Sequence, residues 1–156
     1  MSAQFSLRPA TSDDMQSIIQ IEQKVHVSSW TESQFQSELA KPYSNFLVLT
    51  DDETDTSIAG YIIFWMMYDE CQILNLAVDL AYRGLGLAKM MMRKAMVLAI
   101  KKGIRKMTLE VRKSNLAAIQ LYQELHFAII HVRKNFYSNG EDAYSMMLSL
   151  EDDLRF

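Results

Sequence analysis

The stretch that decides the fold is RGLGLAK, Arg83 to Lys89, which sets two of the chain's five glycines among apolar residues. It follows the apolar run CQILNLAV (71–78) and leads into LAKMMMRKAMVLAIKKG (87–103), whose apolar residues recur at helical spacing. Glycine in a strand-to-helix loop lets the backbone approach a ligand, and the first N–H groups of a helix are unpaired donors. The stretch therefore predicts an anion-binding loop at the start of a helix, with a plain tight turn as the alternative.

Two common phosphate-binding motifs do not fit this spacing. A P-loop places four residues between its first glycine and a Gly-Lys-Ser/Thr, whereas Gly86 is followed by Leu87, Ala88 and Lys89. A dinucleotide-binding fingerprint needs glycine or alanine three residues after Gly86, where Lys89 stands, and belongs to a βαβ unit. The spacing that the chain does contain is Arg-x-x-Gly-x-Ala, at Arg83, Gly86 and Ala88.

Hydrophobic periodicity along the chain predicts an α/β fold with a mixed, mostly antiparallel sheet flanked by helices. Strands are expected over 5–9, 45–50, 58–68, 71–78, 106–111, 128–132 and 143–150, and helices over 15–25, 30–42, 87–103 and 115–126. The order is β-α-α-β-β-β-α-β-α-β-β. Thr31 and Gln34 have the spacing of a capping box, and Asn139-Gly140 is a favoured hairpin pair between the last two strands. The acidic segment 51–56 is expected to be a solvated turn.

Composition predicts one compact domain over residues 1–156, because 49% hydrophobic residues suffice for a core. The longest apolar run, Ile58 to Met67, is too short to cross a bilayer, so we expect a soluble protein without a membrane partner. A single cysteine, Cys71, excludes an internal disulfide and fits a cytoplasmic location. A net charge of −3 with dispersed cations disfavours direct nucleic-acid binding. The three histidines, His26, His126 and His131, lack metal-ligand spacing, so no metal is predicted.

The Arg-x-x-Gly-x-Ala loop after LNLAVDLAY resembles the pyrophosphate loop of the GNAT superfamily of N-acetyltransferases, whose element order is the predicted one. IEQKVHVSSW, LEVRKSNLAAIQLYQELHF and RKNFYSNGEDAYSMML are similar to the bacterial ribosomal-protein alanine N-acetyltransferases of the RimI type. The resemblance covers nearly the whole chain. It implies an enzyme that uses acetyl-CoA to acetylate a protein N-terminus, with the N-terminal alanine of a ribosomal protein as the acceptor, by direct amine attack in a ternary complex.

The resemblance also implies the residues that bind coenzyme A. The strand before the loop would pair with the pantetheine arm, the loop would hold the pyrophosphate, and an asparagine that opens the next helix but one would contact the coenzyme. These residues are Leu76, Ala77 and Val78, then Arg83, Gly84, Leu85, Gly86, Leu87, Ala88 and Lys89, and finally Asn115. A backbone N–H near Leu76 or Ala77 would meet the oxyanion.

Two residues are candidates for the proton transfers that acetyl transfer to an amine requires. Glu110 lies on the polar side of the strand KMTLEV near its end, where α/β clefts open, although a solvated glutamate paired with an arginine is the alternative. The resemblance makes Glu110 the proton acceptor. Tyr122 lies at the edge of the apolar face of its helix, which also suits a packing role. The resemblance makes Tyr122 the acid that protonates the leaving thiolate.

Acceptor-binding residues are implied on two segments that flank the groove in related enzymes. Trp30 lies between the first two helices, and Tyr137 and Glu141 lie before the last strand. One departure from the family pattern is His126, which stands at a left-handed position that is usually glycine. A non-glycine residue there costs on the order of 1 kcal/mol, so we expect strain or a reshaped helix end.

Two other functions remain open at the level of sequence. The same fold acetylates lysine side chains or small amines in other members of the superfamily, in which case peptides with blocked N-termini would be acetylated. The second alternative is a catalytically idle module that binds acyl-CoA. Such a module would keep Gly84 and Gly86 without needing Glu110 or Tyr122. The joint presence of Glu110 and Tyr122 favours an enzyme.

Overall fold

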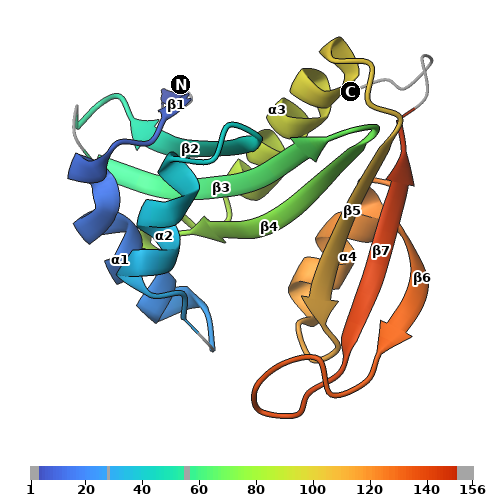
Figure 1. Cartoon of the computed structure of the whole chain (residues 1–156). Coiled ribbons are helices and arrows are strands. Elements are labelled where there is room, and N and C mark those ends of the chain that lie inside the picture. The colour runs from blue at the N-terminus through green and yellow to red at the C-terminus, as the bar shows by residue number, and fades with distance from the viewer. Residues whose placement is uncertain (1–3, 28, 55–56, 151–156) are drawn as a thin grey trace.

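The computed structural model of the chain describes residues 4–27, 29–54 and 57–150. In these parts seven strands form one sheet, and four α-helices and two short 3₁₀ turns (η1 and η2) accompany it (Figure 1). The elements are β1 (Phe5–Pro9), η1 (Ser12–Asp14), α1 (Met15–Val25), α2 (Glu32–Leu39), β2 (Ser44–Asp51), β3 (Ser57–Met67), β4 (Glu70–Val78), η2 (Leu80–Tyr82), α3 (Leu87–Lys101), β5 (Lys106–Arg112), α4 (Leu116–Glu124), β6 (Ala128–Arg133) and β7 (Ala143–Ser149). The predicted order of strands and helices is confirmed. None of the described helices is long and apolar enough to cross a membrane.

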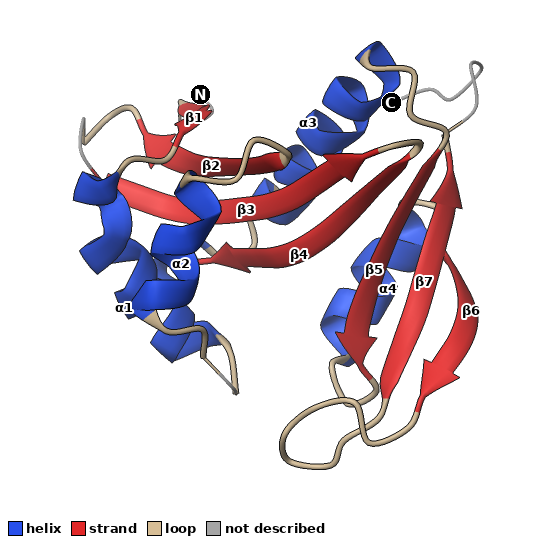
Figure 2. Ribbon diagram, viewed as in Figure 1, coloured by secondary structure: helices blue, strands red, loops and turns tan. Residues whose placement is uncertain are grey.

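The strand order in the sheet is β1-β2-β3-β4-β5-β7-β6, and β4–β5 is the parallel pair. That pair is short, because β4 and β5 share register only from Glu70 with Lys106 to Ile73 with Leu109. Beyond it the strands separate into a V, which Figure 2 shows clearly. The separation begins at a β-bulge, since Ile73 and Asn75 pair with adjacent residues of β3 and leave Leu74 between them. Bulges bend a strand and end its pairing, which is their effect here.

Helices cover the two faces of the sheet unequally (Figure 1). On one face, α1 and α2 bury a core against β2, β3 and β4 that includes Met15, Ile18, Phe35, Val48 and Tyr61. On the other face, α3 and α4 share a larger core that reaches from β2 to β7 and includes Leu49, Ile62, Met91, Leu109 and Met146. Among the described helices, none packs on the α1–α2 side of β5 and β7.

The sequence patterns that set these elements are visible in their burial. On β5, Met107, Leu109 and Val111 are buried and the alternate residues are partly exposed, as the period of two requires. On α3, Met91 and Met92 are fully buried and pack in the core. The capping box at the start of α2 forms as predicted, with Thr31 and Gln34 bonded reciprocally.

Two turn predictions need correction. Asn139-Gly140 does not form a two-residue hairpin, because the loop between β6 and β7 spans residues 134–142 and the pair occupies the end of a turn closed by Gly140 N–H to the Tyr137 carbonyl at 2.8 Å. The acidic turn is not wholly solvated, because Asp51 is buried and accepts a 2.9 Å hydrogen bond from the Tyr82 hydroxyl. Asp55 and Thr56, at the end of that turn, lie outside the described residues.

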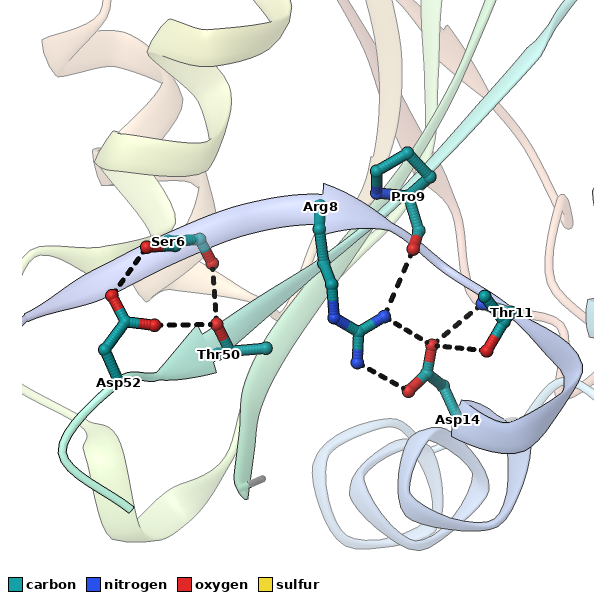
Figure 3. Close-up of polar contacts among 7 residues, drawn as sticks. All are labelled: Ser6, Arg8, Pro9, Thr11, Asp14, Thr50 and Asp52. Atoms are coloured by element: carbon teal, nitrogen blue, oxygen red, sulfur yellow. Dashed lines mark hydrogen bonds and ion pairs between the residues drawn. The ribbon is translucent and has the colours of Figure 1, made fainter. Parts of the chain in front are cut away.

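An ion pair fixes the entry into α1 (Figure 3). The Arg8 guanidinium on β1 donates to both carboxylate oxygens of Asp14, at 2.9 and 2.8 Å, and the Thr11 backbone N–H donates to the same carboxylate at 2.8 Å. Asp14 is buried, so these donors replace the water that its charge would otherwise bind. The Arg8 hydrogen bonds, more than any other contact, lower the pKa of Asp14 below its ordinary 3.8.

We expect Asp14→Asn to lower the free energy of unfolding at pH 7 by about 1–2 kcal/mol, because the hydrogen bonds to a charged group are lost. The folded-state pKa is depressed, so the carboxylate contributes its full stability above pH 3.8 and loses it as the pH falls through the folded-state pKa. The gap between wild type and variant should therefore shrink below pH ~4. Urea unfolding of both proteins at pH 7 and at pH 3 measures this difference in free energy of unfolding. An equal difference at the two pH values would contradict the role of the charge.

Candidate active site

The diverging ends of β4 and β5 form one wall each of a cleft of about 840 Å³. It is completed by the segment between α1 and α2, the start of α3, one side of α4 and the loop before β7. Most of the residues that the sequence analysis selected line it: Trp30, Leu76, Ala77, Val78, Arg83, Gly84, Gly86, Leu87, Ala88, Lys89, Glu110, Asn115, Tyr122 and Tyr137. Leu85 and Glu141 do not line it. Another hollow, of about 530 Å³ beside η1, α1 and α2, contains none of these residues.

The glycine loop has the backbone geometry of an anion site. Gly84 and Gly86 have φ values of 81° and 75°, in the region that favours glycine, and a Cβ at either position would meet nothing within 4 Å. Gly86 is the N-cap residue of α3, and no described side chain caps this helix start. The first backbone bond of the helix runs from Met90 N–H to the Gly86 carbonyl, so earlier N–H groups are free for a ligand. The residues present therefore fit a pyrophosphate group.

Two cations border this loop and both have partners. The Lys89 ammonium lies 2.5 Å from the Glu124 carboxylate, and this hydrogen bond lowers the pKa of Glu124. Arg83 Nε donates to the Val78 carbonyl at 3.3 Å, which ties the loop to the end of β4.

Beyond Ile73, the cleft-facing edge of β4 is not paired with any described strand. The ladder with β5 ends at Ile73, whereas Leu76 to Val78 pair with β3 alone among the described strands. On the opposite edge of β4, β3 lies so close that a Cβ on Gly60 would lie 2.5 Å from the Ala77 carbonyl oxygen. The outward backbone groups of Leu76 to Val78 are thus placed to pair with an extended, amide-containing ligand.

The Glu110 carboxylate lies at the end of β5, on the cleft, and is about one fifth exposed. The Ser145 hydroxyl on β7 donates a short hydrogen bond to Glu110 Oε2. The Arg133 guanidinium on β6 lies 3.5 Å from the same oxygen and also donates from Nε to Ser145 Oγ at 3.1 Å. The sequence left two interpretations of Glu110 open, a position in the cleft and a pairing with an arginine. The structure contains both, because Glu110 lines the cleft and lies beside Arg133.

Tyr122 lines the cleft from α4 and is 8% exposed. Burial, and secondarily Tyr137, raises the pKa of Tyr122 well above its ordinary value, so its hydroxyl keeps its proton at neutral pH. At the other end of the helix, Asn115 acts as N-cap, with its side-chain oxygen accepting from Ala118 N–H at 3.2 Å.

The helix end that holds Tyr122 is not reshaped by His126, so that part of the expectation is wrong. His126 takes φ 75°, and its N–H bonds to the Gln123 carbonyl at 2.9 Å, while Phe127 N–H bonds to the Tyr122 carbonyl at 3.0 Å. This is a complete Schellman motif, and the Tyr122 and Phe127 rings make its usual apolar contact at 5.9 Å between centroids. His126 thus adopts the strained left-handed conformation itself, and the regular helix end around Tyr122 is retained.

The loop before β7 is fastened to the end of β5 by Arg112. Its guanidinium stacks 3.9 Å from the centre of the Tyr137 ring and lies 2.9 Å from the Glu141 carboxylate. Glu141 also accepts from the Ser114 N–H at 2.8 Å, and these contacts with Ser114 and Arg112 lower the pKa of Glu141. Glu141 thus holds Tyr137 in the cleft wall from outside, and its contact with an acceptor stays a prediction.

A buried carboxylate that sequence reasoning missed forms the opposite wall. Glu22 on α1 is 1% exposed and accepts from the Tyr61 hydroxyl, from Asn75 Nδ2 at 3.1 Å and from the Trp30 backbone N–H at 2.9 Å. Burial, and then the Glu22 charge, raises the pKa of Tyr61. The available signal was position, since Glu22 stands four residues after the buried Ile18 on the apolar side of α1. The network fixes the backbone of Trp30 at the cleft.

The fold and the cleft are those of an acetyltransferase, and the chain belongs to the Acetyltransferase (GNAT) family, whose sequence model matches residues 15–127. It is an N-acetyltransferase. A Bacillus subtilis (strain 168) protein that is provisionally named a ribosomal protein bS18-alanine N-acetyltransferase is 35% identical over 97% of this chain and 100% of its own. The Escherichia coli (strain K12) ribosomal protein bS18-alanine N-acetyltransferase is 33% identical over 88% of this chain and 92% of its own. The resemblance stated from sequence is confirmed.

Solved structures show the same architecture. The crystal structure of the ribosomal-protein-S18-alanine N-acetyltransferase from Escherichia coli superposes with a TM-score of 0.85 at 30% identity, over 98% of this chain and 100% of that one. Ard1 from Thermoplasma volcanium gives a TM-score of 0.88 at 26% identity, over 95% and 99% of the two chains. The mixed, mostly antiparallel sheet is therefore the family's fold. Within the described residues, no group of three or more His, Cys, Asp or Glu side chains could hold a metal ion.

We expect His126→Gly to raise the free energy of unfolding by up to about 1 kcal/mol, because glycine adopts φ 75° without steric cost. Thermal unfolding measures the gain. His126→Ala is the matched control, since it removes the imidazole and keeps the strain, and it should leave stability nearly unchanged. A gain that is equal in both variants would trace to the imidazole and would contradict the strain argument.

Proposed function

We propose that the chain transfers the acetyl group of acetyl-CoA to the N-terminal alanine of a ribosomal protein of the bS18 type. The observation that carries the proposal is that one cleft contains the glycine loop, the free edge of β4, and Trp30, Glu110, Tyr122 and Tyr137 together. Near full-length similarity to relatives named for this reaction supports the acceptor. A ribosomal protein is made in the cytoplasm, which supports a cytoplasmic location. The enzyme works as one domain over residues 1–156.

Coenzyme A binding is assigned to the residues that the family pattern selects. The N–H groups of Gly84 to Lys89 at the start of α3 would hold the pyrophosphate, as helix N-termini do. The backbone of Leu76 to Val78 would pair with the amides of the pantetheine arm, with an N–H near Leu76 or Ala77 for the oxyanion. Asn115, at the start of α4, adds a contact to the coenzyme.

The chemistry follows from the two proton carriers in the cleft. An α-amino group with a pKa near ~8 is about one tenth neutral at pH 7, so a carboxylate acting through water suffices to deprotonate it. Glu110 accepts that proton, and the neutral amine attacks the thioester carbonyl. The C–N bond forms and the carbonyl oxygen becomes an oxyanion. When the oxyanion collapses, the C–S bond breaks and Tyr122 donates its proton to the thiolate, so that coenzyme A leaves as the free thiol; the acetylated nitrogen then gives up its extra proton, which restores the Tyr122 hydroxyl.

We expect the protein to acetylate a short peptide that begins with alanine, using acetyl-CoA as the donor. The control peptide has the same sequence with a blocked N-terminus and offers an internal lysine, whose amine is neutral only about once in several thousand at pH 7. Mass spectrometry of both products measures the transfer. Acetylation of the free peptide alone supports the proposal, whereas acetylation of the lysine, or of neither peptide, would overturn the assigned acceptor.

We expect Tyr122→Phe to lower kcat by about ten-fold to a thousand-fold while coenzyme A still binds, because a general acid is lost. Glu110→Gln should chiefly raise the pH that is needed for activity, because the amine must then lose its proton without help. Steady-state kinetics across pH and calorimetric titration with coenzyme A measure both effects. Unchanged turnover in Tyr122→Phe would remove this residue from the mechanism, and an unaltered pH profile in Glu110→Gln would remove the base.

A further inference from the structure

We propose that Ser145 and Arg133 are positioning residues for the base, forming a hydrogen-bond chain that fixes the Glu110 carboxylate and reserves one of its oxygens for the acceptor. The inference rests on the role proposed above for Glu110. It adds two residues, from β7 and β6, that lie far from Glu110 in the sequence.

The chain of hydrogen bonds has one direction. Arg133 Nε donates to Ser145 Oγ at 3.1 Å, and Ser145 Oγ donates to Glu110 Oε2. A guanidinium has no acceptor, so its N–H occupies a lone pair of the serine oxygen and directs the hydroxyl proton toward the carboxylate. Successive donors of this kind polarise each other. The direction of the Ser145 proton is thus set by Arg133 rather than left to rotation.

The arrangement leaves the two carboxylate oxygens unequal. Oε2 receives the Ser145 hydrogen bond and lies 3.5 Å from the Arg133 guanidinium. Among the described residues no hydrogen bond or ion pair engages Glu110 Oε1. Because Glu110 lines the cleft, Oε1 is the oxygen available to an amine or to its water.

Ser145 is suited to this role and has no other visible one. It is 7% exposed, and it stands directly opposite Glu110 in the β5–β7 register. Its neighbours on β7, Tyr144 and Met146, point to the other side of the strand, and Met146 lies in the core. A small apolar residue would fill this position equally well, so the hydroxyl is explained by its bond to the carboxylate.

On the same side of the sheet as Glu110, Thr108 is bonded to Glu70, and His131, which stands opposite Ser145 in the β6–β7 register, is exposed. Three other polar groups face this carboxylate or its surroundings. Arg112 is on the same strand and same side as Glu110, and its guanidinium is engaged with Glu141 and the Tyr137 ring. The Glu110 charge is one of the causes that raise the pKa of Tyr137, after burial. Tyr122 faces the cleft from α4. Among the described residues none of these groups donates a hydrogen bond to Glu110, so the chain through Ser145 is the support of the base.

The test is steady-state kinetics of Ser145→Ala with the alanine peptide. We expect kcat/KM at pH 7 to fall about ten-fold, with KM for acetyl-CoA unchanged. The deficit should shrink to about two-fold at pH 9, because most of the α-amino group is then neutral and needs no base. Ser145→Thr keeps the hydroxyl and should restore activity to within about two-fold. A loss that is the same at pH 7 and pH 9, or equal in both variants, would be structural and would overturn the inference.

Two further variants sharpen the test. Thr108→Val is the matched control, because it removes another hydroxyl-to-carboxylate bond on β5, the 2.7 Å bond to Glu70, and should not change kinetics. Arg133→Met should lower kcat/KM about three-fold alone and add less than that to Ser145→Ala, because Arg133 supports Glu110 through Ser145 as well as through its own 3.5 Å contact with Oε2. Additive losses in the double variant would overturn the chain.

Glu110→Gln, measured beside these variants, separates the inference from the proposed function. A large loss in Glu110→Gln with wild-type kinetics in Ser145→Ala would overturn the chain and leave the base in place. Wild-type kinetics in Glu110→Gln would overturn the base, and the chain with it.

Discussion

The hydrogen-bond ladder between the parallel strands β4 and β5 ends at Ile73 and Leu109, and the strands then separate. The cleft forms because the β4–β5 ladder ends there. The bulge at Leu74 turns the remainder of β4 away, which frees one backbone edge for an extended ligand. The same separation exposes the side of β5 that carries Glu110, so the proposed base faces the ligand edge across the cleft.

The cleft stays open because the two halves of the sheet are joined through one face only. The core under α3 and α4 runs across β4, β5 and β7, and it includes Leu109, Tyr122 and Met146. On the opposite face the core under α1 and α2 stops at β4, and β5 presents Glu110 and Arg112 there instead of apolar residues. Closing the V would remove water from the Glu110 and Arg112 charges on this face, which opposes closure.

Sequence reasoning succeeded where the determinants are close together in the chain. The alternation on β5 and the Thr31 capping box each depend on a few neighbouring residues, and both predictions held. Sequence reasoning failed where the burial of a side chain depends on a partner that is distant in the sequence. Asp51 is buried because the Tyr82 hydroxyl reaches it, and Glu22 is tolerated inside because donors from β3, β4 and the next loop surround it. No local pattern encodes those partners.

The same distinction divides the site. The proposed coenzyme A grip lies within a strand, a loop and a helix start that are consecutive in the chain, and a short motif therefore marks it. The proposed acceptor side is assembled from the segment between α1 and α2, the end of β5, and the loop before β7, with Trp30, Glu110 and Tyr137 each held by a residue from another element. Supports of this kind can change while the coenzyme motif stays constant. In the proposed assignment, the contacts that Glu22, Ser145 and Arg112 make with these three residues set the geometry of the acceptor side.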